Sequence, residues 1–174
     1  MAAQNPYTAP KANVAGAEAF GEIKVFSAGG RIGRVRYIGY TVGLTLLIAL
    51  LMGVLAAVAG VAGGEAAILP IMIAGYGLIF VVQALLSIQR AHDFNTTGWL
   101  AILAFIPLVN LLFWVIPGTE GDNRFGHRPP PNSVGAIVLA WIVPLIFIIG
   151  IIAAIAIPAY QDYVQRAREA QGQQ

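Results

Sequence analysis

The sequence that decides the fold is the uncharged stretch YIGYTVGLTLLIALLMGVLAAVAGVAGG, residues 37–64. It is longer than the roughly 20 apolar residues that a membrane-spanning helix needs. Three more uncharged runs follow it, at 66–89, 94–119 and 129–161. All four are continuously apolar, without the alternation that strands of a membrane β-barrel show. Because backbone polar groups in lipid must bond within their own segment, we expect helices.

The composition indicates the same class of fold. Of the 174 residues, 58% are hydrophobic and 10% are charged, whereas a soluble domain is about 25% charged. We therefore predict an all-α, polytopic membrane helix bundle with about four apolar segments. The chain has no cysteine, which excludes disulfides and thiolate chemistry. No long apolar core precedes residue 37, so we expect no cleavable signal peptide.

The third apolar segment has two interpretations. The expected spans cover residues 37–59, 67–89, 99–117 and 134–157. The third span is near the lower limit of length and carries Pro107 and Asn110 close to its middle. Because proline removes a helical hydrogen bond, this segment is either a kinked span or a re-entrant hairpin that returns to the cytoplasmic side.

Positive charge predicts the orientation in the membrane. Just before the first span lie Lys24, Arg31, Arg34 and Arg36. Such residues favour the cytoplasm, so we expect a multi-pass bacterial inner-membrane protein with a cytoplasmic amino terminus. Four full spans leave Arg124 and Arg128 outside, and a re-entrant third segment leaves Arg166 and Arg168 outside, so charge does not choose between them. Full spans are commoner, and on that ground we expect both termini to be cytoplasmic.

Three blocks of residues flank or interrupt the apolar runs. They read Phe26-Ser27 with Gly30-Arg31-Ile32-Gly33-Arg34 and Arg36-Tyr37; Arg90-Ala91-His92-Asp93 with Thr97-Gly98-Trp99; and Ile106-Pro107-Leu108 with Pro117-Gly118-Thr119 and Asn123-Arg124-Phe125-Gly126. In this order, residues 24–126 resemble the DUF805 family of small bacterial inner-membrane proteins. The resemblance implies an architecture and no chemistry, because the function of that family is unknown.

The last apolar run carries a second pattern. Gly150 and the stretch AAIAIPAYQDY, residues 153–163, resemble the amino-terminal transmembrane helix of type IV pilins. The resemblance implies that residues 137–163 associate laterally with pilins or with membrane proteins of pilus assembly. The pilin processing site is absent, since Ala136-Ile137 and Trp141 stand at its positions. The chain thus resembles the helix of a pilin and not a pilin precursor.

These patterns divide the chain into four expected parts. They are a disordered tail over 1–23, a DUF805-like membrane domain over 24–126, a Pro-rich linker over 127–133, and a pilin-like helix with a short polar tail over 134–174. For function, the sequence favours an interaction or scaffold role, with a small oligomeric transporter or channel as the alternative and an enzyme least supported. Expected partners are the lipid bilayer, anionic lipid headgroups, pilus proteins and further copies of the chain. We expect no nucleic acid, cofactor or metal.

The candidate site residues are ionisable groups near helix ends and small residues on helix faces. Arg90, His92 and Asp93 form either a proton relay or an ion pair that fixes helix ends; the second is favoured, with Asp93 expected to pair with Arg34 or Arg36. Other candidate interface or structural residues are Arg31, Trp99, Asn123 and Arg124. Candidate helix-packing residues are Gly39, Gly43, Gly150, Ala154 and Pro158.

Overall fold

The computed structural model describes residues 19–172, so most of the expected disordered tail lies outside the described residues. The elements in chain order are α1 (Arg34–Val61), α2 (Glu65–Asp93), the 3-10 helix η1 (Gly98–Phe105), α3 (Pro107–Val115) and α4 (Val134–Gly172). Over residues 19–172 the only β-type pairing is an isolated bridge between Asn123 and Gly126. The predicted all-α class is confirmed.

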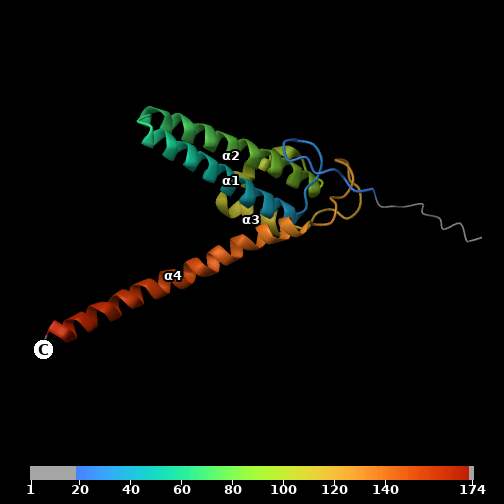
Figure 1. Ribbon diagram of the computed structural model, residues 1–174. Coiled ribbons are helices and arrows are strands. Elements are labelled where there is room, and N and C mark those ends of the chain that lie inside the picture. The colour runs from blue at the N-terminus through green and yellow to red at the C-terminus, as the bar shows by residue number, and fades with distance from the viewer. Residues whose placement is uncertain (1–18, 173–174) are drawn as a thin grey trace, which may run out of the picture.

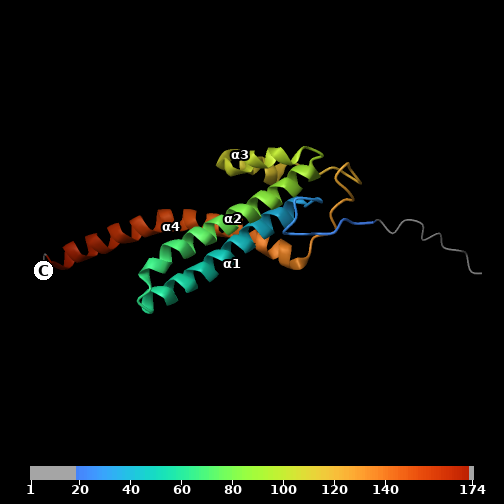
Figure 2. The same cartoon turned by 90° about the horizontal axis from the view of Figure 1, so that it is seen from above.

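Three of these helices, α1, α2 and α4, are long and apolar enough to cross a membrane. At about 1.5 Å per residue, a helix such as α1 is about 42 Å long, against a hydrocarbon core of about 30 Å. α1 and α2 form an antiparallel hairpin (Figures 1 and 2). Many exposed side chains of these helices are Leu, Ile, Val or Phe, which suits surfaces that face lipid. We call the end where α1 begins and α2 ends the charged end.

The third apolar segment folds back as a hairpin toward the end of α2, as the re-entrant interpretation expects and a single full span does not. η1 leads away from the end of α2, and α3 returns, so that the Thr119 amide donates to the Asp93 carbonyl oxygen at 2.7 Å. The reversal occurs at Ile106, whose backbone is extended. The cause is Pro107, which disfavours a helical conformation in the residue before it and lacks the amide of a continuing helix.

The start of α4 packs closely on α1. A Cβ atom at Gly39 would lie 2.5 Å from the Ala136 carbonyl oxygen, and one at Gly43 would lie 2.8 Å from the Leu139 side chain. Only glycine permits this approach of the two backbones. Gly39 and Gly43, two of the three glycines that the sequence marked for helix packing, therefore face α4.

The part of α4 from residue 150 to its end, which we call the outer half, leaves the bundle (Figures 1 and 2). A Cβ atom at Gly150 would meet nothing within 4 Å. The helix continues through Pro144 and Pro158 to Gly172, so the expected span and the polar segment after it form one helix. A proline removes one hydrogen bond, and the adjoining turns keep the helix intact. With 39 residues, α4 is about 58 Å long and extends well beyond the membrane core.

Candidate functional site

A buried group of three charged residues lies at the charged end of the bundle. We call Arg31, Arg90 and Asp93 the arginine–aspartate cluster. Asp93 Oδ1 accepts hydrogen bonds from Arg31 Nε at 3.2 Å and Nη2 at 3.1 Å, and Asp93 Oδ2 accepts from Arg90 Nη1 at 2.5 Å. The three side chains are 1%, 0% and 4% exposed. Two guanidinium groups share one carboxylate, so the cluster carries one net positive charge.

The remaining donors of both arginines bind backbone carbonyl groups of the re-entrant segment and its following loop. Arg31 donates to Thr119 and Gly121 at 2.6 and 2.7 Å. Arg90 donates through Nε to Phe113 at 2.8 Å and through Nη2 to Ile116. Because a buried charge is tolerated only when it is paired and hydrogen-bonded, these contacts fix the hairpin and the loop to α2.

Gly118 lets the loop come this close to the cluster. A Cβ atom at this position would overlap the Asp93 carboxylate. The Thr119 hydroxyl next to it donates to the Asp93 carbonyl oxygen at 2.9 Å. The sequence motif Pro117-Gly118-Thr119 is thus explained by the space and the donor that the loop needs beside Asp93.

The predicted pairing of Asp93 with Arg34 or Arg36 is wrong. Arg34 is exposed and donates to the Val115 carbonyl oxygen at 3.3 Å. Arg36 donates to the carbonyl oxygens of residues 130 and 131. Arg31 reaches Asp93 because the extended segment before α1 lies on α2, where the Ile32 amide donates to the Gln89 carbonyl oxygen at 3.3 Å. Arg34 and Arg36 belong to α1 itself, and their side chains bind other carbonyl groups in place of Asp93.

The other predicted polar residues hold loops together. The His92 ring stacks on Phe125, with centroids 3.9 Å apart and planes at 8°, and its Nδ1 lies 3.2 Å from a carbonyl oxygen of the segment before α1. Asn123 donates to the His92 carbonyl oxygen at 2.9 Å. Arg124 donates to a neighbouring loop carbonyl at 3.1 Å, and Trp99 is 79% exposed at the start of η1. These contacts favour structural roles over a proton relay.

A second polar group, the tyrosine network, lies one to two turns deeper in the bundle. It consists of Tyr37, Gln83, Ser87 and Asn110. The Tyr37 hydroxyl donates to Asn110 Oδ1 at 3.1 Å, lies 3.0 Å from Ser87 Oγ, and accepts from Gln83 Nε2 at 3.0 Å. The network thereby ties α3 to α1 and α2. The spacing of Gln83, Ser87 and Arg90 had indicated a polar face directed into the bundle, but nothing in the sequence identified Tyr37 as its centre.

The arrangement offers a structural anchor and no free reactive group. Both oxygens of Asp93 accept from arginines, which leaves no unpaired base at the cluster. Within residues 19–172, no three His, Cys, Asp or Glu side chains come together as a metal site would require.

The fold and these buried contacts define a class: a polytopic helical membrane protein whose re-entrant hairpin is fixed by an ion-pair cluster. A family described as "Protein of unknown function (DUF805)" matches residues 25–127, more than half of the chain. The chain belongs to this family. The resemblance over residues 24–126 is confirmed, and the pilin-like helix lies beyond the matched range.

Two relatives from Escherichia coli (strain K12) share part of this region. Inner membrane protein YhaI is 40% identical over 58 residues, which are 31% of this chain and 49% of that protein. Inner membrane protein YhaH is 36% identical over 73 residues, which are 39% of this chain and 57% of that protein. The chain thus spans about half the length of these curated relatives. No solved structure matches the chain.

Proposed function

We propose that this chain is an integral inner-membrane interaction protein, in which α1, α2 and the hairpin anchor α4 and leave its outer half available to a partner helix. The observation that carries this proposal is the divergence of α4 from the bundle in both views. The inner membrane follows from the names of YhaI and YhaH and from the apolar helices.

The surface of the outer half suits close contact with another helix. Gly150 and Ala154 are four residues apart and therefore share one face. Small residues at this spacing let helices approach closely in lipid, where van der Waals packing drives association. The same device already operates within the chain, where Gly39 and Gly43 admit the start of α4. The outer half presents a similar surface without a partner from helices α1–α3.

The partner that fits best is a type IV pilin helix or a membrane protein of pilus assembly. The proposal draws on the resemblance of residues 137–163 to a pilin helix. Pilin helices run from cytoplasm to periplasm, and α4 takes that direction if the charged end is cytoplasmic. The re-entrant hairpin supports this direction, because α1 and α4 then begin on the same side.

Site-specific photocrosslinking in cells that make pili tests the proposal. A photoreactive amino acid at position 150 or 154 is expected to capture a pilin-sized partner. Position 152 is the matched control, since it lies about 200° around the helix from both and is also exposed. No adduct from 150 or 154, or equal capture from 152, contradicts the proposal. An adduct of twice the chain's own mass identifies self-association, the first requirement of the channel alternative.

A further inference from the structure

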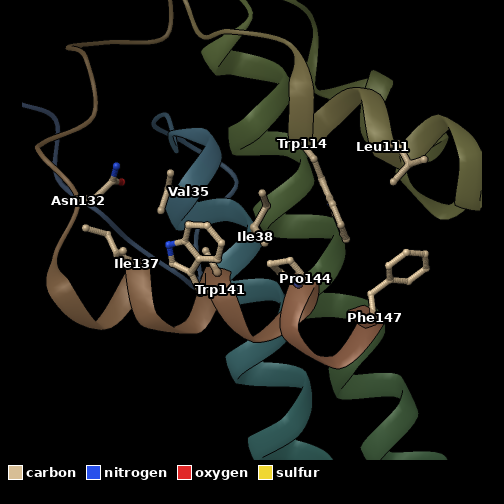
Figure 3. Close-up of a pocket in the computed structure, with 10 residues that line it drawn as sticks. Val35, Ile38, Leu111, Trp114, Asn132, Ile137, Trp141, Pro144 and Phe147 are labelled. Atoms are coloured by element: carbon tan, nitrogen blue, oxygen red, sulfur yellow. The ribbon is translucent and has the colours of Figure 1, made fainter. Parts of the chain in front are cut away.

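Two cavities meet at the charged end, and they differ in character. The apolar cavity, about 880 Å³, lies between α1, α3 and α4, where Trp141, Pro144 and Phe147 of α4 face Leu111 and Trp114 of α3 (Figure 3). The polar cavity, about 490 Å³, lies among the loops beside the arginine–aspartate cluster. Asn132 lines both cavities. A molecule with an apolar part and a polar part would fit across this junction.

The depth of the apolar cavity matches one leaflet of a bilayer. Its lining on α4 extends from Ile137 to Phe147, a rise of about 15 Å at 1.5 Å per residue. This rise is half of the hydrocarbon core of about 30 Å. Leu111 and Trp114 of α3 line the same cavity. The cavity therefore has the depth of acyl chains that belong to the leaflet at the charged end.

The charges around the polar cavity favour an anion. Among the residues that line it, Arg34 contributes one positive charge and Glu120 one negative charge. Asp93 also lines the cavity and belongs to the arginine–aspartate cluster, which carries one net positive charge. Arg34 is exposed, makes one hydrogen bond of 3.3 Å, and has no acidic partner among residues 19–172. Most of its guanidinium donors are thus available to a ligand in the polar cavity that Arg34 lines.

We propose that the two cavities together hold one anionic phospholipid, with acyl chains beside Trp141 and the phosphate beside Arg34. This site is separate from the outer half of α4 and does not depend on a helix partner. A guanidinium group binds a phosphate through several N–H donors. The charge balance selects an anionic lipid over a zwitterionic one, and the apolar cavity selects a lipid over a free phosphate.

Tryptophan fluorescence in vesicles tests the site, because the chain has three tryptophans in different places. A variant with Trp141 alone reports the apolar cavity, and a variant with Trp99 alone reports bulk lipid. Vesicles of phosphatidylcholine receive a small fraction of either brominated phosphatidylglycerol or brominated phosphatidylcholine. At about 1 kcal/mol per arginine near the surface, the brominated anionic lipid should be enriched beside Trp141 by about fivefold, with no such preference at Trp99.

Variants of the Trp141 protein locate the headgroup. Arg34→Gln should reduce the preference to that of Trp99, and Arg34→Lys should keep most of it. Arg124→Gln removes an equal charge from the same end without lining either cavity, and should leave the preference unchanged. An equal preference at Trp99 and Trp141, or an equal loss in Arg124→Gln, overturns the proposal. Displacement by millimolar soluble glycerol phosphate also overturns it, since the site would then bind free phosphate. The same Arg substitutions in the protein with Trp99 alone verify insertion through the quenching of Trp99.

Discussion

The charged end of the bundle and the outer half of α4 use opposite means of organisation. At the charged end, two buried arginines and one aspartate bind carbonyl groups of a hairpin and a loop far away in sequence. The outer half of α4 has exposed apolar side chains, and a Cβ atom at its Gly150 would meet nothing within 4 Å. In lipid an apolar surface gains little until another helix packs on it, whereas a buried charge must be satisfied at once. The charged end is therefore stabilised by contacts within the chain, whereas the outer half of α4 needs another helix for comparable packing.

The largest effect is expected from Asp93→Ala. The change leaves Arg31 and Arg90 buried without their common carboxylate, at a cost of about 3–5 kcal/mol in the free energy of unfolding. Thermal unfolding in mild detergent should show this loss. Asp122→Ala is the control, because its exposed pair with His127 is worth about 0–1 kcal/mol. Equal losses in both variants would show that the cluster is solvated.

A smaller loss is expected from Gly39→Ala at the contact of α1 with α4. The added methyl group meets the Ala136 carbonyl oxygen, which belongs to the backbone and yields little. Overpacking of this kind costs about 1–3 kcal/mol. Gly53→Ala, at an open position of α1, should be neutral or slightly stabilising in the same unfolding measurement. Two neutral variants would mean that α4 does not rest on α1.

Tyr37→Phe should cost about 1–2 kcal/mol, because it removes the hydroxyl shared by three polar side chains of the network. The control is Tyr76→Phe, since Tyr76 is 64% exposed. Limited proteolysis after residue 117 offers a second measurement, as a loosened hairpin should be cut sooner. Unchanged stability and unchanged cleavage would show that the tyrosine network does not hold the hairpin in place.

The smallest effect on stability is expected from Gly150→Leu, within about 0.5 kcal/mol, because a Cβ atom at this position would meet nothing within 4 Å. The same change should abolish crosslinking to a partner helix from position 154. Gly77→Leu, at an equally open position of α2, should alter neither. A loss of stability in Gly150→Leu alone would show that the outer half packs on its own bundle.

The sequence predicted more of the fold than of the site. The length of the uncharged runs was enough to predict α1, α2 and α4, because the thickness of the membrane sets the length of a spanning helix. The same criterion did not decide the conformation of the segment around Pro107, since its length fits a short span and its proline fits a reversal. The partner of Asp93 was missed because Arg31, Arg34 and Arg36 are equivalent by sequence distance, and the choice depends on how the segment before α1 lies on α2. The two cavities arise from three separate elements and leave no local signal.

Cysteine accessibility determines on which side of the membrane the loop after the hairpin lies. The chain has no cysteine, so single substitutions Lys24→Cys, Glu120→Cys and Arg168→Cys report three positions without background. Intact spheroplasts are treated with a membrane-impermeant maleimide, and then labelled again after lysis. If the hairpin is re-entrant, Lys24→Cys and Glu120→Cys lie on the cytoplasmic side, and we expect both to label only after lysis. We expect Arg168→Cys, on the other side, to label in intact spheroplasts. Labelling of Glu120→Cys from the side opposite to Lys24→Cys would show that residues 98–117 span the membrane, and would contradict the account.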